Sequence, residues 1–304
     1  MDWAAPDASA EGPAPRIDPA RLRAATASAP PPGLARLAPM TTSDILDGGF
    51  AILKRAPATI IGLTAVFVVP VHALGAWMGR GVDGIQLDEL LDQTDTSFQL
   101  GEAGTTGSAA AVLQVGPMLA LVFVAAALAR LVSAWHVGQD LSLGALLRGS
   151  LPRAWPLLAS WVLVHALEAV AVIGFGVLPL AVMAWFLVTA PVIGAEGLGP
   201  IRAMRRSARL VSRRFWMVLG LALLSVLVEA LFESAIGLLP TVLSLLLGTD
   251  GLGWVLPGAV RILTQLITVP VVAAITVLIY LDLRVRTEGL DLELDAIEAF
   301  PATT

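Results

Sequence analysis

Five ionisable side chains interrupt the long apolar stretches of this sequence, and their types are the ones most suited to chemistry. They are His72, His165, Glu168, Glu229 and Glu233. A charged group in the middle of a bilayer costs at least about 2.5 kcal/mol on insertion scales, so each of these needs a polar partner or a function. Two imidazoles and three carboxylates could relay protons, bind a cation or contact a lipid headgroup, and in principle hold a divalent metal.

The spacing of these residues arranges them in pairs and at one depth. His165 and Glu168 are three residues apart, so they share a face of a helix, and Glu229 and Glu233 share one in the same way. Counted from the cytoplasmic end of each expected span at about 1.5 Å per residue, His72, Glu168 and Glu229 all lie about 20 Å deep. We therefore expect Glu168 and Glu229 to face each other inside the helical bundle.

A structural role is the alternative for these groups. In that interpretation they hydrogen-bond to one another, or to Ser225 and Ser234, beneath an outer vestibule. Under either interpretation we expect neither a bound metal ion nor a cofactor.

A basic segment at 196–216, EGLGPIRAMRRSARLVSRRFW, predicts an amphipathic helix that begins at Pro200. At about 100° per residue, five arginines lie on one side and five apolar residues on the other. The arginines are Arg202, Arg205, Arg206, Arg209 and Arg213, and the apolar residues are Ile201, Met204, Ala208, Val211 and Phe215. Since apolar runs flank it on both sides, we expect this helix to join two membrane spans along the membrane surface.

Three uses of this arginine face remain open. Basic residues hold a loop on the cytoplasmic side, and they also bind anionic lipid headgroups with about 1 kcal/mol per residue. The face could also bind the acidic end of the chain, which carries Asp291, Glu293, Asp295 and Glu298. Nucleic acid is disfavoured as a partner because no stacking aromatic residues are interleaved with the arginines.

The composition places the chain in a bilayer. Of its 304 residues, 57% are hydrophobic and only 14% are charged, and the mean hydropathy is +0.81. The sequence has no cysteine, which excludes a disulfide framework, a thiolate nucleophile and a thiolate metal site.

Apolar runs and their boundaries predict an all-α polytopic bundle with six transmembrane helices and amphipathic surface helices. The expected spans are 58–78, 109–131, 155–175, 177–195, 215–236 and 258–281. Residues 1–40 are expected to form a disordered tail, 41–289 the membrane domain and 290–304 an acidic tail. The apolar segment Gly237 to Leu247 is too short to cross alone, so we expect a short interfacial or re-entrant helix there.

The distribution of positive charge predicts the orientation. All but two of the nineteen lysines and arginines lie before the first span, after the sixth, or in the connections after spans two and four, if Arg130 at the end of span two is counted with the connection; the exceptions are Arg80 and Arg261. Because positively charged short loops stay inside, both termini are expected in the cytoplasm, with the protein in the plasma membrane.

A shift of 61 residues exposes an internal repeat. It places Arg153 on Arg214, Trp155 on Trp216, Glu168 on Glu229, Gly176 on Gly237 and Pro179 on Pro240. We infer three units, each a surface helix, an outgoing span and a returning span. The first unit begins with a short helix that Thr42 or Ser43 is expected to cap.

Signatures of common enzymes are missing from the sequence. The GEAGTTGS stretch at 101–108 lacks the lysine and the preceding strand of a phosphate loop. There is also no G-x-S-x-G or H-E-x-x-H motif and no large soluble catalytic region. These observations favour a protein that is not an enzyme.

Three motifs resemble a group of actinobacterial integral membrane proteins, which look like the membrane domain of glycerophosphoryl diester phosphodiesterases. The motifs are TTSDILDGGFAILKR at 41–55, GAEGLGPIRAMRRSARLVSRRFWMVLG at 194–220 and YLDLRVRTEGLDLEL at 280–294. The resemblance covers about residues 39–296 and implies a helical membrane domain. No segment resembles the catalytic barrel, with its histidine and paired-carboxylate metal site, that follows this domain in some members, so the resemblance does not imply phosphodiesterase activity.

These features together predict a membrane subunit or scaffold that engages lipid or a partner protein, in an oligomeric state that the sequence leaves open. The alternative is a small transporter or channel in which Pro117, Pro179, Pro191 and Pro270 break helices around the glutamates. A third interpretation is an intramembrane enzyme built on His165, Glu168 and Glu229. A continuous water-accessible cavity that reaches the glutamates would favour transport, and a sealed bundle would favour the scaffold.

Overall fold

The structure is a computed structural model that describes residues 39–78, 105–136, 138–174, 177–247 and 255–290. Within these ranges every regular element is a helix, which confirms the all-α class. The helices are α2 (Thr42–Arg55), α3 (Pro57–Met78), α5 (Thr105–His136), α6 (Leu143–Ser150), the short 3-10 helix η2 (Leu151–Arg153), α7 (Ala154–Gly174), α8 (Leu178–Phe186), α9 (Thr189–Glu196), α10 (Pro200–Ser212), α11 (Phe215–Leu247) and α12 (Val255–Glu288). The expected tails at 1–40 and 290–304 lie outside the described residues except at their inner edges.

Six segments among the described residues are long and apolar enough to cross a membrane, as expected. They are Pro57–Met78, Val115–His136, Leu143–Ile173, Leu178–Glu196, Phe215–Ile236 and Gly258–Glu288. The chain is therefore a multi-pass membrane protein. The second and sixth of these reach His136 and Glu288, farther than the expected ends at 131 and 281.

Residues 237–247 do not form a separate interfacial or re-entrant helix. They continue α11 without interruption, so this expectation is wrong. A continuous helix bonds its backbone groups within itself, which an apolar environment favours over a break that exposes them.

The fourth span, by contrast, is interrupted between α8 and α9. Pro191 has no N–H to donate to the carbonyl of Leu187, and its ring crowds that carbonyl, which weakens the helix at this point. The helices α5 and α12, by contrast, continue through Pro117 and Pro270, which the sequence had suggested as breaks. Ser207 of α10 donates its hydroxyl proton to the carbonyl oxygen of Trp185 at 2.8 Å, at the end of α8. The end of α8 at this break is therefore hydrogen-bonded to the amphipathic helix α10.

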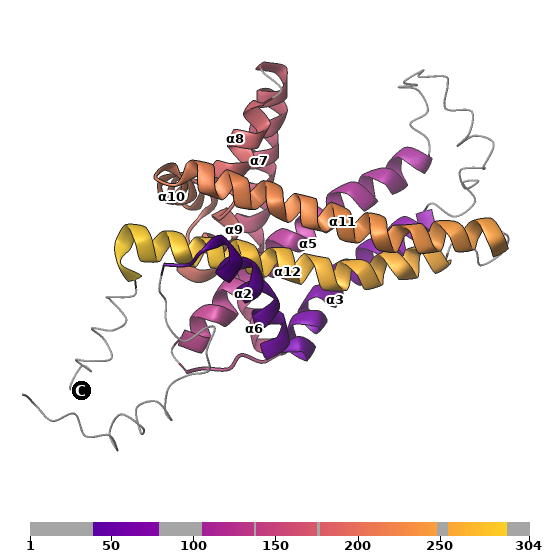
Figure 1. Cartoon of the computed structure of the whole chain (residues 1–304), viewed down its shortest axis with the longest axis horizontal. Helices are drawn as coiled ribbons and strands as arrows, with labels where there is room; N and C mark the ends of the chain where they lie inside the picture. Colours follow the sequence, from indigo (N-terminus) through magenta and orange to yellow (C-terminus); the bar gives the residue numbers. More distant parts are fainter. Residues whose placement is uncertain (1–38, 79–104, 137, 175–176, 248–254, 291–304) are drawn as a thin grey trace, which may run out of the picture. The chain divides into compact units, whose positions relative to one another are not determined.

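The helices follow the order expected for three units. The amphipathic helices α2, α6 and α10 come before the outgoing spans α3, α7 and α11, and each outgoing span packs on its own returning span (Figure 1). Each surface helix also packs on the returning span of another unit: α6 on α5, α10 on α8 and α9, and α2 on α12. The surface helices therefore connect the units to one another.

Outgoing and returning spans differ in burial. In the most apolar 18-residue stretch of each span, 72% of the residues are buried in α12, 11% in the span that contains α7 and 22% in α11. Large apolar side chains such as Ile173 on α7 and Leu231 on α11 are exposed. In a bilayer such surfaces face the lipid chains, so α7 and α11 present the lipid-facing sides of their units.

Small residues allow α5 and α9 to approach closely. Ala125, Ala126, Ala127 and Ala129 of α5 are buried, and so is Gly194 of α9. A Cβ atom added at Gly194 would lie 2.0 Å from the carbonyl oxygen of Ala126. Only glycine fits at this contact between two spans.

The first surface helix, α2, has its cap one residue before the expected position. The hydroxyl of Thr41 accepts a bond from the backbone N–H of Asp44, and the carboxylate of Asp44 accepts one from the N–H of Thr41 at 2.8 Å. These bonds form a capping box, and the bond from the Thr41 hydroxyl lowers the pKa of Asp44. The helix ends at Lys54 and Arg55, as expected.

Candidate functional site

The amphipathic helix α10 presents a row of arginines to the surroundings. Arg202, Arg205, Arg209 and Arg213 are exposed, which agrees with the face expected from the sequence. The opposite side is buried against α8 and α9 through Ala203, Met204, Ser207, Leu210 and Val211. Ile201 is an exception to the expected apolar side, since it is 56% exposed. We call the four exposed residues the arginine face.

Arg206, the fifth arginine of the expected set, has a different environment. Its Nε lies 3.1 Å from Oε2 of Glu196 at the end of α9, and its Nη2 donates to Oε2 of Glu288 on α12 at 2.8 Å. Nη1 of Arg206 also contacts Glu288. The hydrogen bonds that Arg206 donates to Glu288 raise the pKa of Arg206. This side chain holds three helices together rather than facing outward.

Two residues of α12 extend this set of contacts. The hydroxyl of Tyr280, which is 1% exposed, donates to Oε1 of Glu196 at 3.0 Å. Nε of Arg284 donates to Oε2 of Glu288 at 3.1 Å. We call Glu196, Arg206, Tyr280, Arg284 and Glu288 the Glu196 network. Each partly buried carboxylate in it has at least one cationic partner, as buried charges require.

A second set of bonds ties the start of the membrane domain to α12. Asp282 is 0% exposed and accepts bonds at 2.8 Å from the backbone N–H of Met40 and from Nε of Arg286. Nη2 of Arg286 donates to the carbonyl of Met40, also at 2.8 Å. Met40 is thus fixed to α12, although the sequence suggested a disordered tail through residue 40.

The three motifs that carried the resemblance come together at the end of α12. The motif at 41–55 begins beside Met40, the motif at 194–220 supplies Glu196 and Arg206, and the motif at 280–294 supplies their partners. Sequence reasoning did not assign these roles. A signal was present in the i,i+4 spacing of Asp282 with Arg286 and of Arg284 with Glu288.

Of the ionisable residues inside the spans, one pair forms as expected. Nε2 of His165 lies 3.8 Å from Oε2 of Glu168 on the same helix, α7. Nδ1 of His165 lies 2.9 Å from the carbonyl oxygen of Trp161, where a protonated Nδ1 donates. The Glu168 side chain is 25% exposed, on the sparsely covered span of the second unit.

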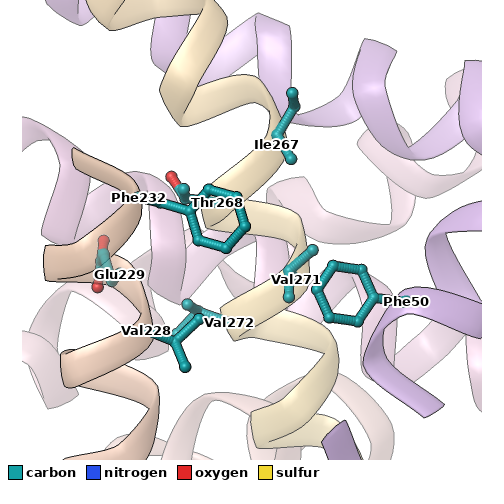
Figure 2. A pocket seen from close by; sticks show the side chains of 8 residues that line it. All are labelled: Phe50, Val228, Glu229, Phe232, Ile267, Thr268, Val271 and Val272. Atoms are coloured by element: carbon teal, nitrogen blue, oxygen red, sulfur yellow. The ribbon is translucent and has the colours of Figure 1, made fainter. Parts of the chain in front are cut away.

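Glu229 lies in a different environment, a pocket between α2, α11 and α12. Figure 2 shows the eight side chains that line it, with Phe50 of α2 beside Val271 of α12 and Glu229 on α11. The others are Val228, Phe232, Ile267, Thr268 and Val272. Its cavity of about 10 Å³ is close to the smallest that accommodates a water molecule.

The expected meeting of Glu168 and Glu229 finds no support. Within the described residues α7 packs mainly on α8, α10, α5 and α9, whereas α11 packs mainly on α12 and α8. Ser225 and Ser234, which the structural interpretation offered as partners, donate their hydroxyl protons to carbonyls of α11 itself. The side chain of Glu233 lies outside the described residues.

His72 of α3 is buried at 1% exposure, and neither ring nitrogen has a hydrogen-bond partner among the described residues. Nor do any three His, Asp or Glu side chains in the described ranges lie close enough to hold a metal ion. The five intramembrane residues therefore occupy three separate helices, and among the side chains that the structure describes His165 and Glu168 form a pair.

Comparison of the chain with models of known protein families, with curated proteins and with solved structures gave no match. The assignment of a function therefore depends on the geometry above.

Proposed function

We propose that this multi-pass protein is a non-enzymatic subunit or scaffold of the plasma membrane that engages anionic lipid headgroups through the arginine face of α10. The observation that carries the proposal is the contrast within one helix. Arg206 is bonded to two carboxylates, whereas Arg202, Arg205, Arg209 and Arg213 are exposed and have no ion pair with any described residue.

The position of α10 next to the start of a span supports a lipid partner. Trp216, in the first turn of α11, is 80% exposed and follows Arg213 by three residues. Tryptophan concentrates at membrane interfaces, where its ring lies at the level of the headgroups. Cytoplasmic orientation of the surface helices, expected from the positive charges, would bring the arginine face to the anionic leaflet. Each arginine there contributes about 1 kcal/mol.

The resemblance to the membrane domain of glycerophosphoryl diester phosphodiesterases agrees with the scaffold part of this proposal. The motifs that carry the resemblance form contacts between helices. A protein partner at the same face remains part of the proposal. The transport alternative receives no support from the pocket beside Glu229, whose cavity accommodates about one water molecule.

Neutralising the arginine face tests the proposal. Replacement of Arg202, Arg205, Arg209 and Arg213 by glutamine is expected to weaken binding of short-chain phosphatidylglycerol to the purified protein at least tenfold, because four charges that each contribute about 1 kcal/mol are lost. Binding is measured by native mass spectrometry in a mild detergent at fixed low salt.

The matched control removes the same charge elsewhere. Replacing Arg16, Arg21, Arg23 and Arg36 by glutamine changes the net charge equally but leaves α10 intact, and we expect a much smaller effect. If both variants weaken phosphatidylglycerol binding equally, the effect comes from net charge alone. Unchanged binding by the α10 variant would refute a lipid role for the arginine face.

A further inference from the structure

We propose that Arg130 and Arg153 form a second binding site for a phosphate group, presented by an anionic phospholipid, at the end of α5 and apart from α10. Both guanidinium groups lie against Gly149 of α6. A Cβ atom added at Gly149 would be 1.9 Å from Nη1 of Arg130, so the absence of a side chain at position 149 leaves room for the Arg130 guanidinium group. Nη1 of Arg153 donates to the carbonyl of the same Gly149 at 2.7 Å.

The bonds of Arg153 fix its orientation. Besides Gly149, it donates from Nε to the carbonyl of Ile193 on α9 at 3.2 Å. Both acceptors are backbone carbonyls, which hold the side chain in place, and no carboxylate in the part of the chain that the structure describes pairs with its positive charge. Nη2 of Arg153 points to the vicinity of Gly197, which begins the connection to α10.

Arg130 has no acceptor among the described residues. Its Nη1 is buried without a hydrogen-bond partner, and the charge of Arg153 lies close enough to repel it. A partly buried guanidinium beside a second one is unfavourable unless an anion is shared between them. Arg153 keeps Nη2 for a further acceptor, since its Nε and Nη1 are bonded to carbonyls, and the guanidinium group of Arg130 supplies the other donors for phosphate oxygens.

The surroundings of this arginine pair favour a lipid over free phosphate. Leu151 and Trp155, two residues before and two residues after Arg153 in the sequence, are 71% and 74% exposed. Exposed apolar and indole side chains at the start of a span are typical of the boundary between headgroups and acyl chains. Basic pockets between spans at that level bind the headgroups of anionic lipids.

The test uses the full-length protein in a mild detergent and compares Arg130→Gln and Arg153→Gln with wild type. The probes are short-chain phosphatidylglycerol, short-chain phosphatidylcholine and inorganic phosphate, with binding followed by native mass spectrometry and by thermal stabilisation. We expect each variant to bind phosphatidylglycerol at least fivefold more weakly, with phosphatidylcholine and inorganic phosphate binding weakly throughout. Arg148→Gln is the matched control, because Arg148 is an exposed arginine of α6 bonded only to its own helix.

Stability without lipid separates binding from a structural role. Because Arg130 has no acceptor, Arg130→Gln should unfold at the same or a higher temperature than wild type in lipid-free detergent, and phosphatidylglycerol should stabilise it less. A lower unfolding temperature with unchanged lipid binding would overturn the site. Equal binding of inorganic phosphate and phosphatidylglycerol would overturn the lipid assignment. The variant that neutralises the arginine face should keep the phosphatidylglycerol binding that depends on Arg130. Each of the two proposals can therefore be refuted without the other.

Discussion

Replacing Gly194 with alanine is expected to lower the free energy of unfolding by about 1–3 kcal/mol, the usual cost of overpacking. The added Cβ would lie 2.0 Å from the carbonyl oxygen of Ala126 and 2.7 Å from two further backbone atoms of that residue. Backbone atoms cannot rotate away as a side chain does, so α5 and α9 must separate. The unfolding temperature of the purified protein should fall by several degrees, and a bulkier Gly194→Val change should lower it further.

Gly220→Ala is the control for this prediction. Gly220 is an exposed glycine inside α11, and an added Cβ there would meet nothing within 4 Å. Alanine is the better helix former, so this change should raise stability by about 0.5–1 kcal/mol. A protein that tolerates alanine at both glycines equally would show that α5 and α9 are not in close contact.

Replacing Arg206 with alanine is expected to cost about 2 kcal/mol of stability. Its side chain is 20% exposed and lies between Glu196 and Glu288, so its loss leaves two neighbouring carboxylates without their shared cation. Removal of one partner from a fully buried ion pair costs more than this, and partial access to water reduces the loss. Thermal unfolding in detergent measures the change.

Two further variants make the Arg206 test specific. Arg205→Ala removes an exposed arginine of the arginine face from the same helix and should change stability by less than about 0.5 kcal/mol. A double-mutant cycle with Glu196→Gln should reveal coupling between Glu196 and Arg206. Equal losses for Arg205→Ala and Arg206→Ala, with no coupling, would mean that the Glu196 network does not hold the helices together.

Features with a local cause could be predicted from the sequence. Span positions follow from apolar runs, and the sides of α10 follow from helical periodicity, since both are properties of one segment. The pairing of His165 with Glu168 was predictable for the same reason, because spacing along one helix sets which side chains share a face.

Features that depend on how helices are rotated could not be predicted in this way. Glu168 and Glu229 were assigned one depth, but depth leaves open which side of a span faces its neighbours, and the structure gives the two different surroundings. The bond between Glu196 and Tyr280 joins residues 84 apart in sequence, and no local pattern predicts it. The interruption of the fourth span was indicated by Pro191, but its bond to Ser207 depends on the packing of α10.

We propose that α2, α6 and α10 all lie at the cytoplasmic surface, where the arginine face meets anionic lipid. Because the chain has no cysteine, single cysteines can report this directly. Asp47→Cys, Gly144→Cys and Arg205→Cys place one exposed thiol on each surface helix, and Ser97→Cys places one between the first two spans. A membrane-impermeant maleimide should label the first three only in inverted vesicles and Ser97→Cys only in intact cells. Labelling of Arg205→Cys in intact cells would contradict the claim.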